Sequence, residues 1–323
     1  MIRGLVIGKF MPVHKGHIAL INFAASQCNE LIVSMSYTDN DPINFQFRFN
    51  WLKEIFADQP NIKPHLIKDD FDNELLSLHE RTKLWAKKMQ QQYPPVHIIF
   101  SSENYGQPFA KNMHAKHIPF NAERTNIPVS ATLIRTKPLT YWNYIPEVVQ
   151  PYFVKKICFY GPESTGKTYM SKLMAAQYKT GWVPEAAREI LTSNEFSEKE
   201  IMQIALAHDE CINQKLQTAN KLLFCDTDVI TTQIYAQHYL GAVPQRLFEI
   251  EKKITYDLYF LMNIDTPWIE DPLRDLGNKR AEMFAVFKAA LDKRNISYVL
   301  IKGDYKQREA IVVTELNKLL QKF

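Results

Sequence analysis

The octapeptide GPESTGKT at residues 161–168 combines residue types that bind a nucleoside triphosphate. It follows the apolar run 157–160 and precedes a helical pattern, so its glycines let backbone N–H groups turn toward phosphate oxygens. The helix adds its positive end beneath the same phosphates. We therefore predict an ATP site in which Lys167 is catalytic, Thr168 also binds Mg²⁺, and the nucleotide is held by Gly161, Glu163, Ser164, Thr165, Gly166 and Thr168.

Acids follow two other apolar runs of the second half. Asp226 ends the run 222–226, where it would lie near Thr168 and the metal, so it is a candidate metal ligand. Glu185 follows the run 181–184. Either Glu185 or Asp226 could accept a proton from an acceptor hydroxyl, and both are candidate catalytic residues between which the sequence does not choose.

A charged stretch from Asp271 to Arg280 follows a further predicted strand. It resembles the mobile lid of small-molecule kinases, in which Arg274 would close over ATP phosphates and exclude water. The alternative is a solvated loop with surface ion pairs. Trp182 and Trp268 flank the candidate acids, where they would either stack on a flat substrate ring or belong to the core.

A second nucleotide motif lies near the start of the chain. Residues 8–17 follow the first predicted strand, and His14 and His17 are separated by a lysine and a glycine. Both rings can donate N–H groups to one phosphate, and such donors stabilise the charge that develops at the α-phosphate during adenylyl transfer. We predict His14 and His17 as catalytic and Gly8, Lys9 and Phe10 as ATP-binding.

The segment PVSATLIR at 128–135 complements the histidines. Ser130 can cap the helix that it begins, while Thr132 and Arg135 can reach the β- and γ-phosphates. We predict Ser130 and Thr132 as ATP-binding and Arg135 as catalytic. Each segment alone also fits a turn with satisfied histidines or a capped surface helix, but together they look like the H-x-G-H nucleotidylyltransferase superfamily.

Apolar runs alternate with amphipathic stretches in both halves of the chain, which predicts an α/β fold with parallel sheets. The 323 residues favour two domains. We predict a Rossmann-like nucleotidylyltransferase fold over 1–137, a connector rich in proline and aromatic residues over 138–152, and a P-loop kinase fold over 153–323. The strands are expected at residues 4–10, 31–36, 63–68, 96–101, 156–160, 222–225, 258–263 and 297–301.

Composition excludes several classes of protein. The net charge of +4 is not gathered into a basic run, so nucleic acid is not an expected partner, and small anionic ligands account for the excess. No apolar stretch is long enough to span a membrane, and we expect a cytoplasmic protein. The four cysteines lie far apart in apolar or periodic segments and are predicted to be packed in the core. The oligomeric state stays open, a homo-oligomer included.

These motifs together resemble the bifunctional NadR-type proteins, which join a nicotinamide mononucleotide (NMN) adenylyltransferase to a ribosylnicotinamide kinase. The resemblance covers nearly the whole chain. Several of its segments are not general features of phosphate-loop proteins, above all DTD at 226–228 and TPW at 266–268. The resemblance rests on residues 8–17, 100–106, 124, 128–135, 161–168, 185–189, 224–233 and 266–277.

The resemblance implies that ATP phosphorylates ribosylnicotinamide in the second half and adenylylates NMN in the first, giving NAD and pyrophosphate. It also implies substrate-binding roles for Arg124, Trp182, Asp228, Trp268 and Asp271. Some relatives carry an N-terminal helix-turn-helix domain, but only seven residues precede Gly8, so we expect no DNA-binding function. The alternatives are an adenylyltransferase for another acceptor, such as phosphopantetheine, fused to a small-molecule kinase, and a nucleotide sensor without turnover.

Overall fold

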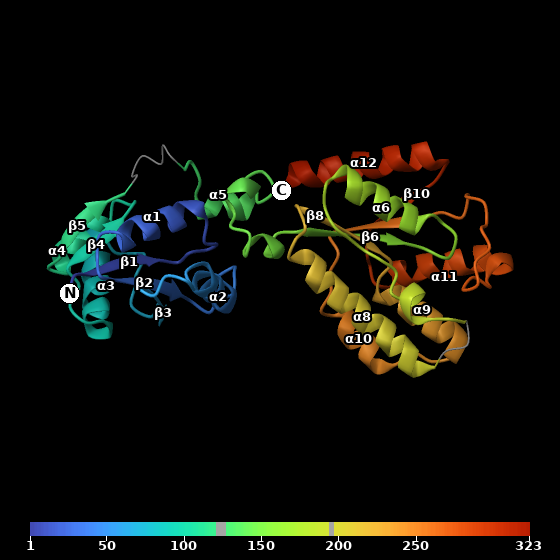
Figure 1. The fold of residues 1–323 in the computed structure, drawn as a ribbon, viewed down its shortest axis with the longest axis horizontal. Helices are drawn as coiled ribbons and strands as arrows, with labels where there is room; N and C mark the ends of the chain where they lie inside the picture. Colours follow the sequence, from blue (N-terminus) through green and yellow to red (C-terminus); the bar gives the residue numbers. More distant parts are fainter. Residues whose placement is uncertain (121–126, 194–196) are drawn as a thin grey trace. The chain divides into compact units, whose positions relative to one another are not determined.

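The computed structural model describes residues 1–120, 127–193 and 197–323. It contains two compact units, one made of Met1–Gln150 with Phe323 and the other of Pro151–Lys322 (Figure 1). Each unit has its own five-stranded sheet in which all paired strands are parallel. The predicted α/β class with two parallel sheets is therefore confirmed.

The N-terminal unit has the strand order β3-β2-β1-β4-β5. The order reverses beside β1, and open parallel sheets bind ligands outside the carboxyl ends of the strands at such a point. Its strands are β1 (Arg3–Gly8), β2 (Glu30–Tyr37), β3 (Ile62–Lys68), β4 (Ile98–Ser101) and β5 (Lys116–Pro119). Its helices are α1 (Lys15–Ala25), α2 (Phe45–Ile55), α3 (Leu78–Gln92), α4 (Gly106–Asn112) and α5 (Ala131–Thr136), followed by the 3₁₀ turns η1 (Trp142–Tyr144) and η2 (Gln150–Tyr152).

The C-terminal unit has the order β10-β9-β6-β8-β7, with β6 at the centre. Its strands are β6 (Lys155–Tyr160), β7 (Trp182–Val183), β8 (Leu222–Asp226), β9 (Leu258–Met262) and β10 (Tyr298–Ile301). Its helices are α6 (Lys167–Gln177), α7 (Ala187–Ile190), α8 (Glu198–Leu216), α9 (Val229–Leu240), α10 (Gln245–Glu251), α11 (Arg280–Lys293) and α12 (Tyr305–Lys322), with the 3₁₀ turn η3 (Gly277–Lys279) before α11.

Alternate residues of β6 pack into cores on opposite faces of its sheet. Ile157 and Phe159 contact a cluster that includes residues of α6 and α12, whereas Cys158 and Tyr160 contact one that includes residues of α9 and α11. A sheet that is covered on both faces needs strands that are apolar throughout, as this one is. All four cysteines are free thiols, and Cys158 and Cys225 are buried.

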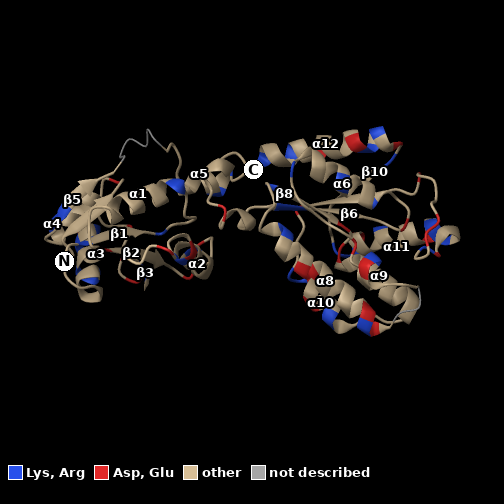
Figure 2. Cartoon of the chain, viewed as in Figure 1, with Lys and Arg blue, Asp and Glu red and all other residues tan. Residues whose placement is uncertain are grey.

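The eight strands that the sequence predicts are all present, while β5 at the edge of the first sheet and the short β7 at the edge of the second were not among them. Helix α3 begins at Leu78, because the Ser77 hydroxyl accepts the Glu80 N–H and Glu80 accepts the Ser77 N–H, a capping box. In the described part of the chain, no helix is long and apolar enough to cross a membrane. Basic and acidic residues are intermixed along both units (Figure 2).

Candidate active sites

The phosphate loop connects β6 to α6 through two glycines with positive φ. Gly161 has φ +142°, and a Cβ there would lie 2.9 Å from the Met262 carbonyl oxygen. Gly166 has φ +86° and is the residue before the first turn of α6. Side chains are strongly disfavoured at such positions, so the tight turn requires glycine. Lys167 is buried and its Nζ donates to the carbonyl oxygens of Gly161 (2.8 Å) and Pro162 (2.9 Å).

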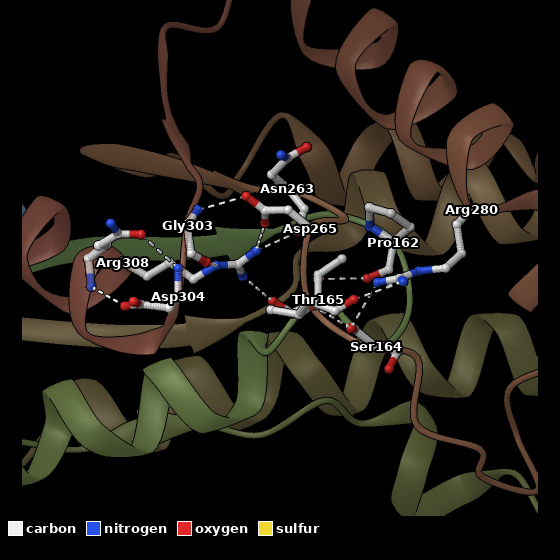
Figure 3. Close-up of polar contacts among 11 residues, drawn as sticks. Pro162, Ser164, Thr165, Asn263, Asp265, Arg280, Gly303, Asp304 and Arg308 are labelled. Carbon is white, nitrogen blue, oxygen red and sulfur yellow. Dashed lines mark hydrogen bonds and ion pairs between the residues drawn. The ribbon is translucent and has the colours of Figure 1, made fainter.

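Two arginines hold the phosphate loop by its carbonyl oxygens (Figure 3). Arg308 of α12 is completely buried and donates to Thr165 (2.7 Å), Asn263 (2.9 Å) and Gly303 (2.8 Å), while it also pairs with Asp265. Arg280 donates to the Ser164 oxygen at 3.2 Å. The sequence did not single out Arg308, because a charged residue in an amphipathic helix is usually solvated, whereas Arg280 was expected only as the end of the charged stretch compared with a kinase lid.

The candidate metal ligands lie in direct contact, since the Thr168 hydroxyl donates to Asp226 Oδ2. Burial, and then the charge of Glu185, raise the pKa of Asp226 to about 6. Its Oδ1 atom is buried and has no hydrogen-bond partner among the described residues. Glu163 is also buried enough that its pKa is raised to about 7, although Lys167 opposes the shift. The site is therefore rich in carboxylates that are costly to ionise.

A cavity of about 290 Å³ opens beside the phosphate loop. Glu163, Lys167 and Thr168 line it on the loop side, and Glu185 lies at the end of β7. Helices α8 and α9 supply a further part of the wall with apolar, aromatic and polar side chains, and α7, the segment after β9 and Tyr305 also contribute to it. The lining residues from these two helices are Ile201, Ile204, His208, Thr231, Thr232, Tyr235 and Tyr239.

The charged segment after β9 contacts the loop and the acids. Arg188 connects this segment to the acid after β7, since it donates to Asp271 Oδ2 (2.8 Å) and to Glu185 Oε2 (3.2 Å). The Ile269 N–H donates to the Ser164 hydroxyl at 2.8 Å. Arg274 lines the cavity, and its guanidinium donates to the Ile269 carbonyl oxygen at 2.8 Å.

Four residues expected to bind substrate, Asp228, Trp182, Trp268 and Asp271, do not line this cavity. Asp228 caps α9, accepting from the Thr231 N–H and the Tyr259 hydroxyl, both at 2.9 Å. Trp182 packs against the core on one face of the sheet. Trp268 lies against Gly277, where a Cβ would come within 2.9 Å of the indole, and both residues line a separate open hollow together with Asp271.

In the N-terminal unit, His14 and His17 form the first turn of α1. The His17 N–H donates to His14 Nδ1 (3.4 Å) and the His14 N–H donates to His17 Nδ1 (3.3 Å), while the two rings stack at 3.7 Å. Because each Nδ1 accepts a backbone proton, the hydrogen-bond network assigns the proton of each neutral ring to Nε2. Both rings are therefore set up as Nε2–H donors. A Cβ on Gly16 would lie 3.0 Å from the His14 ring, so a side chain there would push the ring from its present position.

The predicted partner segment begins α5 and contacts the loop that precedes the histidines. Ser130 caps α5 by accepting the Leu133 N–H at 3.2 Å. Arg135 donates to the Met11 carbonyl oxygen and, at 3.1 Å, to the Thr132 hydroxyl. The structure thus brings Thr132 and Arg135 to the turn that precedes the histidines. Arg124 lies outside the described residues.

A second cavity, of about 170 Å³, lies at the carboxyl ends of β1 and β2. Gly8 and Lys9 line it, and the Lys9 carbonyl oxygen accepts from Arg48, which is fully buried and paired with Asp41 at 2.5 Å. The sequence did not identify the rest of the lining, because its aromatic residues fit an ordinary core. These residues are Ile7, Ser34, Ser36, Asp69, Phe71, Asp72, Arg81, Trp85, Met89 and Tyr105.

Two parallel sheets, one with an H-x-G-H loop and one with a phosphate loop, define an enzyme that combines a nucleotidyltransferase with a kinase. The chain is 30% identical to the trifunctional NAD biosynthesis/regulator protein NadR of Escherichia coli strain K12 and to that of Salmonella typhimurium, in each case over 94% of this chain and 80% of the relative. It belongs to the NadR family of NAD biosynthesis proteins.

Further relatives and solved structures match one half of the chain or the whole of it. A nicotinamide-nucleotide adenylyltransferase of Pyrococcus abyssi is 26% identical over 49% of this chain and 84% of its own length. The family model described as AAA domain matches residues 156–308. A crystal structure of NadR in complex with NAD and AMP-PNP has the same fold, with a TM-score of 0.81 at 22% identity, covering 99% of this chain and 96% of that one. A NadR structure in complex with NR has a TM-score of 0.80.

Proposed function

We propose that this chain makes NAD in two steps, each of which uses one ATP. The C-terminal unit phosphorylates ribosylnicotinamide to NMN, and the N-terminal unit transfers the adenylyl group of a second ATP to NMN, releasing pyrophosphate. The observation that carries the proposal is the pair of cavities, each beside its own nucleotide motif in its own sheet. Family membership and the titles of the NadR complexes with NAD, AMP-PNP and NR support it.

In the kinase step, Thr168 and Asp226 would hold Mg²⁺ with the ATP phosphates. The contact between them and the unpartnered buried Oδ1 of Asp226 fit a cation, which would neutralise charge on the β- and γ-phosphates. Among the described residues no three His, Cys, Asp or Glu side chains gather into a metal site, so the phosphates would supply much of the coordination. Lys167 would turn from its loop carbonyls to the phosphates.

We assign the proton acceptor of this step to Glu185. Glu185 lines the cavity and its side chain is 22% exposed, whereas Asp226 is fully buried and bound to Thr168. A base must lie within hydrogen-bond reach of the hydroxyl whose proton it takes, and only the first of these carboxylates lines the acceptor space. Arg188, which pairs with Glu185, keeps this carboxylate oriented.

In the adenylyl step, a phosphate oxygen of NMN would attack the α-phosphorus of ATP while the bond to pyrophosphate breaks. The Nε2–H groups of His14 and His17 would donate to the oxygens that gain charge, and Arg135 would stabilise the leaving pyrophosphate. No covalent intermediate on the protein is required. The capping box positions both donors before the substrates bind, so no reorganisation is needed during the reaction.

The cavity beside Lys9 favours NMN over phosphopantetheine as the acceptor. It combines the aromatic rings of Phe71, Trp85 and Tyr105 with the carboxylate of Asp69, while the second carboxylate, Asp72, is paired with Arg81. Aromatic faces and carboxylates attract a flat cation such as a pyridinium ring. The flexible uncharged arm of phosphopantetheine offers neither a ring nor a positive charge to these groups.

The direct test supplies the purified protein with Mg-ATP and either ribosylnicotinamide or NMN and separates the products by chromatography. We expect NMN and NAD from the first substrate and NAD from the second. His17→Ala should lower adenylyl transfer by about 10²- to 10³-fold and spare the kinase, and Lys167→Ala should do the reverse. If either substitution in a folded protein abolished both steps, the model of two separate sites would be wrong.

A further inference from the structure

His208 is a buried polar residue in the wall of the kinase cavity. It lies on α8 seven residues after Ile201 and four after Ile204, so the three side chains share one helix face, and all three line the cavity. Its side chain is 5% exposed. The corresponding positions in the two preceding turns hold isoleucine. A buried imidazole at the third position needs a hydrogen-bond partner.

The hydrogen bonds of the ring define what kind of contact is missing. The Pro184 backbone carbonyl favours a proton on the imidazole. Nε2 is buried and has no partner among the residues that the structure describes. We therefore place the proton of the neutral ring on Nδ1, toward Pro184. Burial also lowers the pKa of His208 to about 4, so the ring is neutral at pH 7 and Nε2 is a hydrogen-bond acceptor. Buried acceptors of this kind are normally paired.

The position of Pro184 indicates which end of a nucleoside His208 would meet. Pro184 directly precedes Glu185, to which we assign the proton of the primary hydroxyl. The secondary hydroxyls of the sugar are attached to the same five-membered ring as that primary hydroxyl and can donate hydrogen bonds. The carboxamide N–H groups lie at the far end of ribosylnicotinamide, beyond the glycosidic bond and away from that primary hydroxyl.

We propose, on the basis of the kinase function proposed above, that Nε2 of His208 accepts a hydrogen bond from a ribose secondary hydroxyl of the acceptor. His208 is then a positioning residue that makes the kinase select ribosides against deoxyribosides. The contact also orients the sugar so that its primary hydroxyl faces Glu185. The selectivity arises because a deoxyriboside would leave the buried Nε2 without a donor.

The test measures kcat/KM of the full chain with ribosylnicotinamide and with its 2′-deoxy and 3′-deoxy analogues, in wild type, His208→Leu and His208→Gln. In wild type we expect one analogue to be about 10- to 100-fold poorer than the riboside, which identifies the hydroxyl. His208→Leu should lose the same factor on the riboside and nothing further on that analogue. His208→Gln, which retains an acceptor, should recover part of the selectivity, and the KM for ATP should not change.

Ile204→Val is the matched control, because it alters the same wall without removing a polar group. It should change the riboside and both analogues by equal factors. Equal losses on all three substrates in His208→Leu would overturn the proposal, since that result describes damage to the wall. A wild type that does not distinguish the riboside from either analogue would overturn it as well. A wild type that phosphorylates no riboside would overturn the kinase assignment and this inference with it.

Discussion

Backbone N–H groups determine which nitrogen of the His14 and His17 rings can donate a hydrogen bond. Each Nδ1 accepts the other residue's backbone N–H, so the proton of each neutral ring lies on Nε2. Lys167 is comparable, because two carbonyl oxygens of its own loop hold its ammonium group before a nucleotide replaces them. The chemistry proposed for both units therefore depends on side chains that are oriented in advance.

Gly16→Ala should damage adenylyl transfer without unfolding α1. The new Cβ would lie 3.0 Å from the His14 ring, so the ring must shift from its stack with His17. We expect kcat/KM for NMN to fall by about 10²-fold, as for the loss of one donor. Alanine is a better helix former than glycine, so thermal stability should not fall. Kinase activity of the same variant is the control, and an unchanged adenylyl transfer rate would contradict the proposed role of the ring.

At the scale of elements, helices bring groups to the loops that bind phosphate. Helix α12 carries Arg308 to the phosphate loop about 140 residues earlier, where its guanidinium donates to the Thr165 carbonyl oxygen. Helix α9 is itself held by a buried acid, Asp228, at its first turn. The positions of these helices thus determine the shape of the kinase site.

Arg308→Lys should weaken both the unit and its nucleotide site. Lysine keeps the charge but cannot donate to three carbonyl oxygens and a carboxylate at once. We expect unfolding free energy to fall by about 2–4 kcal/mol in urea denaturation and the KM for ATP to rise. Lys318→Ala on the same helix removes a surface pair with Glu315 and should cost less than about 1 kcal/mol. Equal losses in the two variants would refute the assigned role of Arg308.

Asp228 gives α9 a dependence on pH. Burial raises the pKa of this carboxyl to about 6, above the value of about 3.9 expected in the unfolded chain. The folded state therefore binds the proton more tightly, and this group adds stability as pH falls from 7 to 5, by about 1 kcal/mol. Asp228→Asn keeps the cap but cannot titrate, so the difference in unfolding free energy between pH 7 and 5 should shrink by that amount. An unchanged difference would show that Asp228 titrates normally.

At the scale of the whole molecule, each proposed reaction has its own sheet, core and cavity. The two units bury separate hydrophobic clusters, and neither nucleotide motif contributes to the other unit's cavity in the described part of the chain. NMN would be the product of one of these sites and the substrate of the other.

Mixing two single variants should restore the complete conversion. His17→Ala should form NMN from ribosylnicotinamide but little NAD, and Lys167→Ala should form NAD only from NMN. When the two variants are mixed with Mg-ATP, they should convert ribosylnicotinamide to NAD after a lag in which NMN accumulates. Chromatography of timed samples measures both products. If the mixture made NMN but no NAD, while Lys167→Ala still used added NMN, release of the intermediate would be excluded.

The sequence by itself determined the two α/β units and the segments that form their loops. Glycine spacing in GPESTGKT and the alternation of apolar runs predict local backbone conformation, which depends on neighbouring residues. For the same reason, the predicted helix cap at Ser130 and the predicted helix after the phosphate loop are both found in the structure. The motif DTD predicted acids at the end of a strand, but not that Asp228 would cap a helix instead of lining the cavity.

Only the tertiary structure decided which distant residues complete each site. Arg308, His208 and Trp85 lie in amphipathic helical patterns, where periodicity alone predicts a solvated arginine and ordinary core positions. Trp182, expected near the substrate, belongs to the core of the sheet. The physical reason is that burial and hydrogen-bond partners arise from packing between segments far apart in the chain, which no local pattern contains.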